Sequence, residues 1–134
     1  MSVEETGRVI EGYFSGHGDQ WLAEAVEFHD TSQPEPHRGR EAVGRWLHHF
    51  YGEAFPGATA AEPRLVVGDG IAAADWVFRG RHLGSLGGEP PTGRTVAVPM
   101  AAVYEVEGGA IVRARLYYDS ALLARQLQPE PAPR

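Results

Sequence analysis

Hydrophobic and polar residues alternate along the second half of the chain with the period of β-strands. The alternation predicts a hairpin over residues 64–82 and two further strands over residues 95–106 and 111–119. Turn residues stand between the strands, at 68–70 and again at 107–109. Residues 120–127 have the pattern of a short closing helix. Strands of this length can curve around helices and enclose a deep pocket, so we look for function there.

The first half of the chain has mainly helical spacing. Ser2 and Glu5 have the spacing of a capping box, and apolar residues follow at helical intervals. Asp19 is a candidate cap for a second, short helix that carries Trp21, Leu22 and Ala25. Residues 26–32 alternate as a strand, and residues 40–51 place their apolar side chains on one helical stripe.

Helices first and antiparallel strands afterwards indicate the α+β class. We expect a curved antiparallel or mixed sheet, wrapped around the N-terminal helices, that forms a conical pocket. The length predicts one domain over residues 1–128. Residues 129–134 contain three prolines and are expected to form a flexible tail.

Composition excludes several classes of function. The formal charge of −6 and the pI of about 5.4 argue against a nucleic-acid partner. The absence of cysteine excludes disulfides and thiolate catalysis, and the six histidines lack metal-ligand spacing, so no metal is expected. No stretch has the apolar length of a membrane span, and the N-terminus lacks the features of a signal peptide. We therefore expect a soluble, cytoplasmic protein without a membrane partner.

Three segments carry a resemblance to a known family. They are GRHLGSLGGEPPTGR at 80–94, VYEVEGGAIVRARLYYD at 103–119 and LLARQL at 122–127. Together they resemble the SnoaL-like polyketide cyclases, whose cone-shaped fold is shared with ketosteroid isomerases and nuclear transport factor two. The resemblance implies a cavity on the concave face of the sheet, a homodimer through its convex face, and no cofactor.

This chain departs from the family's pattern at two catalytic positions. The family's cyclases use a histidine and an aspartate as acid and base, and ungapped alignment from Gly80 places these positions on Ala102 and Leu116. Neither side chain accepts a proton. The segment AVEFHDTSQPEPHRGREAVGRWLHHFY at 25–51 is similar to the ketosteroid isomerase segment that holds the general base, and that base maps onto Asp30. The oxyanion partners of the isomerase do not carry over.

Three polar residues are candidates for catalysis. Asp30 ends a strand at the expected cavity mouth, where burial would suit it to general-base work; a turn aspartate is the alternative. His82 follows the hairpin and can exchange a proton near neutral pH, or it can hold the loop after it. Asp119 ends the last strand, where it can act in the site or cap the closing helix.

The expected substrate-binding residues are mostly aromatic or small and apolar. A run of aromatic side chains on a sheet is also typical of an ordinary core. These residues are Tyr13, Trp46, Phe50, Trp76, Phe78, Met100, Ala102, Tyr104, Leu116 and Tyr118.

The sequence thus predicts an enzyme of secondary metabolism without a cofactor, which binds a hydrophobic small molecule and performs acid–base chemistry. Cyclisation, isomerisation and hydration are the reactions considered. The alternatives within the same fold are a cofactor-independent monooxygenase and an epoxide hydrolase. A further alternative is a binding protein that performs no catalysis, which the apolar Ala102 and Leu116 favour.

Overall fold

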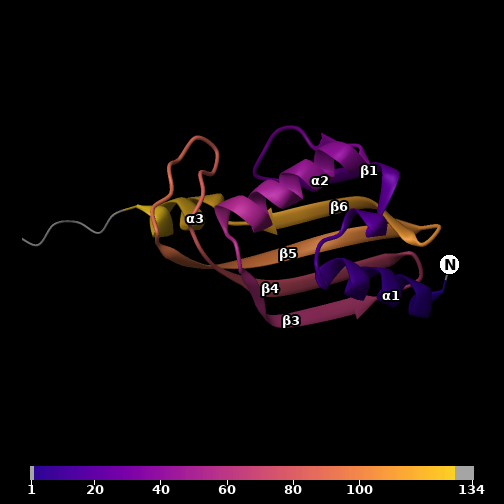
Figure 1. Ribbon diagram of the computed structural model, residues 1–134. Helices are drawn as coiled ribbons and strands as arrows, with labels where there is room; N and C mark the ends of the chain where they lie inside the picture. The colour runs from indigo at the N-terminus through magenta and orange to yellow at the C-terminus, as the bar shows by residue number, and fades with distance from the viewer. Residues whose placement is uncertain (1, 129–134) are drawn as a thin grey trace, which may run out of the picture.

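A six-stranded curved sheet carries three helices, as the computed structural model shows for residues 2–128 (Figure 1). The strands lie in the order β2-β1-β6-β5-β4-β3, and β1 and β6 run parallel while the other neighbours are antiparallel. The architecture is an α+β cone, as predicted. The helical elements are α1 (Val3–Phe14), η1 (Asp19–Trp21), α2 (Arg40–His48), η2 (His49–Ala54) and α3 (Ser120–Leu127); the strands are β1 (Leu22–Asp30), β2 (His37–Arg38), β3 (Thr59–Val67), β4 (Ile71–Arg81), β5 (Thr95–Glu107) and β6 (Ala110–Tyr118).

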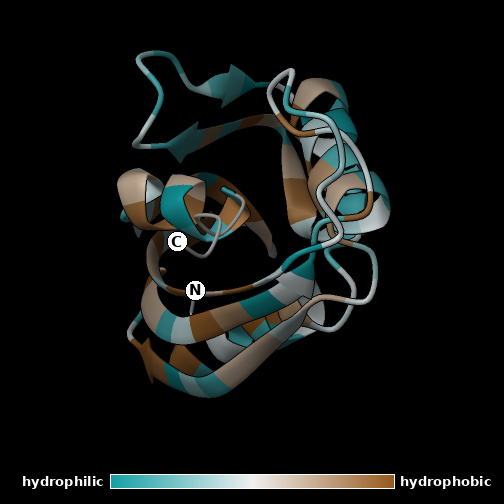
Figure 2. Ribbon diagram, turned by 90° about the vertical axis from the view of Figure 1, so that its left-hand side faces the viewer, coloured by the Kyte–Doolittle hydropathy of each residue, from teal (hydrophilic) through white to brown (hydrophobic). Residues whose placement is uncertain are grey.

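Successive side chains along each strand point to opposite faces of the sheet, and one of the two faces is buried. In β5, every second residue from Val96 to Val106 is buried, and the residues between them are more exposed. β4 follows the same rule, with Ala72, Ala74, Trp76 and Phe78 buried. Figure 2 shows the resulting bands of hydrophobic and hydrophilic residues along the curved strands. The concave face therefore forms the core.

The helix α1 begins where the sequence predicts, and a partly buried hydrogen bond fixes its place on the sheet. The side chain of Ser2 accepts a hydrogen bond from the backbone N–H of Glu5 at 3.1 Å. Thr6 is buried, and its hydroxyl accepts from the backbone N–H of Gly70 at 2.9 Å. This bond ties the β3–β4 turn to α1, which lies across β3 and β4 in Figure 1.

Several predicted boundaries were wrong. The helix expected from Asp19 is a single 3₁₀ turn, and Leu22 and Ala25 belong to β1. This strand begins four residues before the predicted one because Leu22 pairs with Ile111 of β6. The helix predicted to end at Tyr51 changes at His49 to a π-helical turn, which continues to Ala54. The expected tail at 129–134 lies outside the described residues.

Helix α3 completes one end of β5. The β6 partner of β5 ends at Tyr118, opposite Met100, so Ala97 lies beyond it. The side chain of Gln126 takes the place of a strand there: its Oε1 accepts from the N–H of Ala97 at 2.7 Å, and its Nε2 donates to the carbonyl of Ala97 at 2.8 Å. Both backbone groups are thereby satisfied.

No helix among residues 2–128 has the length and apolar character needed to cross a membrane.

We expect Gln126→Ala to lower the free energy of unfolding by about 2 kcal/mol, because it removes two hydrogen bonds worth about 1 kcal/mol each. The neighbouring Gln128 is exposed, so Gln128→Ala is the matched control and should change stability by less than about 0.5 kcal/mol. Urea unfolding followed by circular dichroism measures both. Equal stabilities of the two variants would contradict the role given to Gln126.

Candidate functional site

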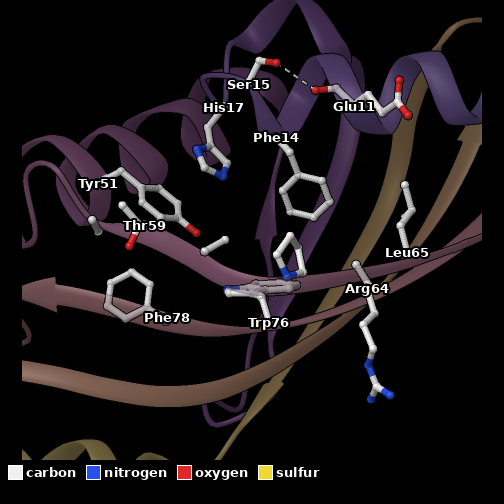
Figure 3. A pocket seen from close by; sticks show the side chains of 14 residues that line it. Glu11, Phe14, Ser15, His17, Tyr51, Thr59, Arg64, Leu65, Trp76 and Phe78 are labelled. Carbon is white, nitrogen blue, oxygen red and sulfur yellow. Dashed lines mark hydrogen bonds between the residues drawn. The ribbon is translucent and has the colours of Figure 1, made fainter.

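A cavity of about 550 Å³ lies between α1, the π-helical turn η2 and the strands β3 and β4. Figure 3 shows its side chains from close by. Most of them are apolar, and four carry the aromatic rings of Phe, Tyr or Trp. The lining consists of Glu11, Phe14, Ser15, His17, Tyr51, Ala58, Thr59, Ala60, Pro63, Arg64, Leu65, Ala74, Trp76 and Phe78.

The cavity has an aromatic wall because α1 brings Phe14 over the concave face. The ring of Phe14 meets Trp76 edge to face, with centroids 5.6 Å apart, and it meets Tyr104 in the same way at 5.7 Å. Ala74 leaves room beside them, since it occupies a concave-face position in β4 with only a methyl group. Such a surface suits a flat, apolar ligand.

His17 and Tyr51 supply polar atoms at one side of this cavity. Their rings are stacked, with centroids 4.0 Å apart and an angle of 8° between the planes. The edge of Tyr13 meets His17 at 4.9 Å. In Figure 3, the imidazole and the Tyr51 hydroxyl point toward the space above Trp76, whereas the guanidinium of Arg64 points away.

Burial widens the pH range over which both groups stay neutral. It lowers the pKa of His17 to about 4, so the imidazole is neutral near pH 7. It raises the pKa of Tyr51 to about 12, and burial also raises the pKa of Tyr104 and of Tyr13, with smaller contributions from neighbouring tyrosines. The cluster therefore offers neutral donors and acceptors at physiological pH.

The backbone is unusual at two places along the cavity. Within residues 2–128, the non-glycine residues with positive φ are His17, at 54°, and Glu62, at 53°. His17 lines the cavity, and Glu62 directly precedes Pro63, which also lines it. Non-glycine residues in this conformation are uncommon and cluster at functional sites. Both positions thus mark this cavity as the candidate site.

Asp30 lies on the same concave face but at a distance from this cavity. The register places Asp30, Leu116, Ala102 and Ala74 in one row across β1, β6, β5 and β4. Three strand spacings separate Asp30 from Ala74, which amounts to about 14 Å. Asp30 is not among the residues that line the 550 Å³ cavity.

The carboxylate of Asp30 is buried, with 6% of the residue exposed, and both of its oxygens are occupied. Oδ1 accepts from the backbone N–H of Ser32 at 2.9 Å and from its hydroxyl at 2.6 Å. Oδ2 accepts from the hydroxyl of Tyr118 at 2.9 Å. Burial, chiefly, raises the pKa of Tyr118 to about 12. These bonds are those of a turn aspartate, and the catalytic role of Asp30 stays a prediction.

Comparison with known proteins places the chain in a family. The family model of the SnoaL-like polyketide cyclases matches residues 16–127. The chain belongs to the SnoaL-like polyketide cyclase family.

Solved structures of SnoaL-like and related proteins share the fold. A SnoaL-like protein from Jannaschia sp. CCS1 is 15% identical and has a TM-score of 0.86, with 96% of this chain and 94% of that chain covered. An NTF2-like protein from Burkholderia xenovorans LB400 is 22% identical, with a TM-score of 0.77 and coverage of 96% and 99%. IdmH from Streptomyces antibioticus, a proposed polyketide cyclase, is 26% identical, with a TM-score of 0.69 and coverage of 91% and 97%. No curated protein matches the sequence.

The two other predicted catalytic residues of this SnoaL-like protein are His82 and Asp119, and both form hydrogen bonds that hold neighbouring backbone in place. His82 is fully buried, and its Nδ1 accepts from the backbone N–H of Thr92 at 3.2 Å, which holds the loop at 83–94. Its Nε2 has no hydrogen-bond partner within residues 2–128. The side chain of Asp119 caps α3 by accepting from the N–H of Leu122 at 3.0 Å. The structure thus gives each residue the structural contacts that the sequence offered as the alternative.

Of the predicted substrate-binding residues, Trp76 and Phe78 line the cavity. Tyr118 bonds Asp30, and the remaining seven pack in or against the core around the cavity: Tyr13, Trp46, Phe50, Met100, Ala102, Tyr104 and Leu116.

Four cavity residues were not predicted from the sequence: Phe14, His17, Tyr51 and Ala74. The signal that could have found His17 is its place between two glycines, where a histidine with positive φ is accommodated.

Within residues 2–128, no three His, Cys, Asp or Glu side chains are grouped in a way that could hold a metal ion.

We expect the half-buried, neutral imidazole of His17 to make the stability of the protein depend on pH. Between pH 6.5 and about 4, the unfolded chain binds a proton at His17 that the folded chain does not. The free energy of unfolding therefore falls as the pH falls through this window, by on the order of 2–3 kcal/mol from this residue. Urea unfolding of wild type and His17→Asn at several pH values measures the effect.

Asparagine tolerates the positive φ of this position and does not titrate. The difference between the two curves isolates His17 from the other histidines, including His37, whose pKa burial also lowers. Parallel curves for the two proteins between pH 4 and 6.5 would show that His17 is not buried as described.

Proposed function

We propose that this SnoaL-like protein is an enzyme that binds a hydrophobic, ring-containing small molecule and moves a proton on it. The observation that carries the proposal is a neutral imidazole and a phenol placed together at the side of an apolar cavity of about 550 Å³. The membership of the family supports this reading, because the family's cyclases use acid–base chemistry on polyketide chains. Cyclisation and isomerisation are the reactions that such a site favours.

The cavity explains how the substrate would be held. Its volume lies within the range typical of small-molecule sites, about 300–1,000 Å³. A flat ring system would lie against Trp76 and Phe78, with Phe14 at its edge. Displacement of water from these surfaces supplies binding energy, and the rigid rings orient the reacting carbons.

The polar pair explains how the chemistry would proceed. The neutral imidazole of His17 accepts a proton from a carbon next to a substrate carbonyl. The hydroxyl of Tyr51 donates a hydrogen bond to the carbonyl oxygen, on which negative charge develops as the proton leaves. The imidazolium, disfavoured in the empty cavity, is stabilised by the enolate that forms in the same step.

This assignment differs from that of the family's cyclases for a chemical reason. Their acid–base positions correspond here to Ala102 and Leu116, both of which are apolar and buried on the concave face. Proton transfer must then come from other polar groups near the cavity. His17 and Tyr51 line it, whereas the oxygens of Asp30 are already bonded.

A binding protein without catalysis is the second candidate. The mostly apolar lining of the cavity and the loss of acid–base residues at Ala102 and Leu116 favour it. Such a protein would hold a reactive intermediate and release it unchanged.

The experiment follows exchange of the protons next to the carbonyl of 2-tetralone in D₂O by proton NMR. We expect the wild type to accelerate exchange, and His17→Asn to lower the rate by about a hundredfold, since asparagine cannot accept the proton. Asp30→Asn, a change to the same residue type on the same concave face, should retain the rate.

Other outcomes separate the candidates. If Asp30→Asn loses the exchange activity and His17→Asn retains it, the base is Asp30 and not His17. Binding of 2-tetralone without any acceleration, measured by calorimetry, would favour the binding protein.

A further inference from the structure

A second space lies on the other side of the His17–Tyr51 pair. It is a groove of about 750 Å³ between the end of α1 and the outer side of α2 and η2. His17 and Tyr51 are the residues that line both spaces, so the stacked pair forms the wall between them. The groove is lined by Gly16, His17, Asp19, Arg40, Glu41, Gly44, Arg45, Leu47, His48, Tyr51, Gly52 and Glu53.

The two spaces have opposite chemistry. The cavity is aromatic and apolar, whereas the groove carries charged residues of both signs. Arg45 forms an ion pair with Glu41 at 3.0 Å, and Nε of Arg40 donates a hydrogen bond to the carbonyl of Leu22 at 3.0 Å. Three acidic and two basic side chains line the groove, so its net formal charge is small. A groove of this kind suits a neutral, hydrogen-bonding group better than a strongly anionic or cationic one.

The wall is built from two segments with uncommon backbone conformations. His17 has φ of 54° and stands between Gly16 and Gly18, in the short connection from α1 to η1. Tyr51 belongs to a π-helical turn, a feature found frequently at functional sites. A rotation of the imidazole away from the tyrosine ring would join the cavity and the groove.

From this arrangement we propose that the binding site is bipartite. The apolar cavity takes the ring system of the ligand, and the groove holds an uncharged polar arm. The rings of His17 and Tyr51 separate to let the middle of the ligand pass between them. The ligand class is therefore an amphiphilic molecule, with hydrophobic rings at one end and a hydroxyl- or ether-rich chain at the other. This inference rests on the proposed function, which places the rings in the cavity.

Gly44 offers a way to fill the groove without touching the cavity. It lies within α2 and lines the groove only, and a Cβ added there would meet no atom within 4 Å. Gly44→Trp therefore places a large side chain in the groove. Gly44→Ala is the matched control, because it makes the same change to the backbone and leaves the groove open.

The test uses two probes with the same ring system: 2-hydroxyanthraquinone and its ether with triethylene glycol. Calorimetry gives Kd for each probe with wild type, Gly44→Ala and Gly44→Trp. We expect Gly44→Trp to raise the Kd of the extended probe at least about tenfold more than the Kd of the short probe. Gly44→Ala should keep the ratio of the two Kd values at its wild-type value.

Each remaining outcome is decisive. If Gly44→Trp binds the short probe and leaves the ratio unchanged, the groove takes no part in binding and this inference fails alone. If the short probe does not bind the wild type, the proposed function fails and the inference fails with it. Binding of the short probe by Gly44→Trp also reports that the variant is folded.

Discussion

The packing of α1 on the concave face of the sheet determines where everything else in this protein can lie. Ile10 and Tyr13 bury their side chains in the core, and Phe14, one position further along the helix, meets Trp76 and Tyr104 edge to face. These contacts hold the helix over β3 and β4 and leave a cavity at its end. If α1 packed differently, no aromatic wall would face Trp76.

The same packing sets the charge of the polar groups. His17 follows α1 directly, so the position of the helix brings its ring onto Tyr51 and between the tyrosines. Burial there favours the neutral imidazole and the neutral phenol. A neutral imidazole and phenol can face an apolar substrate at little electrostatic cost, and this pair gains charge only as the proton moves. In the proposed reaction, the substrate therefore binds before any charge appears on His17 or Tyr51.

The ends of β4 and β6 show why two residues that were predicted to be catalytic make structural contacts. Asp119 follows the last residue of β6, where the chain turns into α3, and an N-cap is what the helix requires there. His82 follows β4 and is enclosed by the loop that it holds. Each residue type suits acid–base work in general, yet its hydrogen bonds are used locally. Alternation and chemistry alone could not distinguish these uses.

The sequence by itself determined the α+β class, the long strands, the cap of α1 and the membership of the family. These depend on local spacing: period-two burial along β4 and β5, and side chains that bond a backbone only two or three residues away. Tertiary structure alone decided that Leu22 begins a strand, that Asp30 bonds Tyr118 and that His17 stacks on Tyr51. In each of these cases the partner lies more than 30 residues away in the chain. The first two contacts exist because β1 pairs with β6, and the third because α1 packs on the concave face and brings His17 to η2.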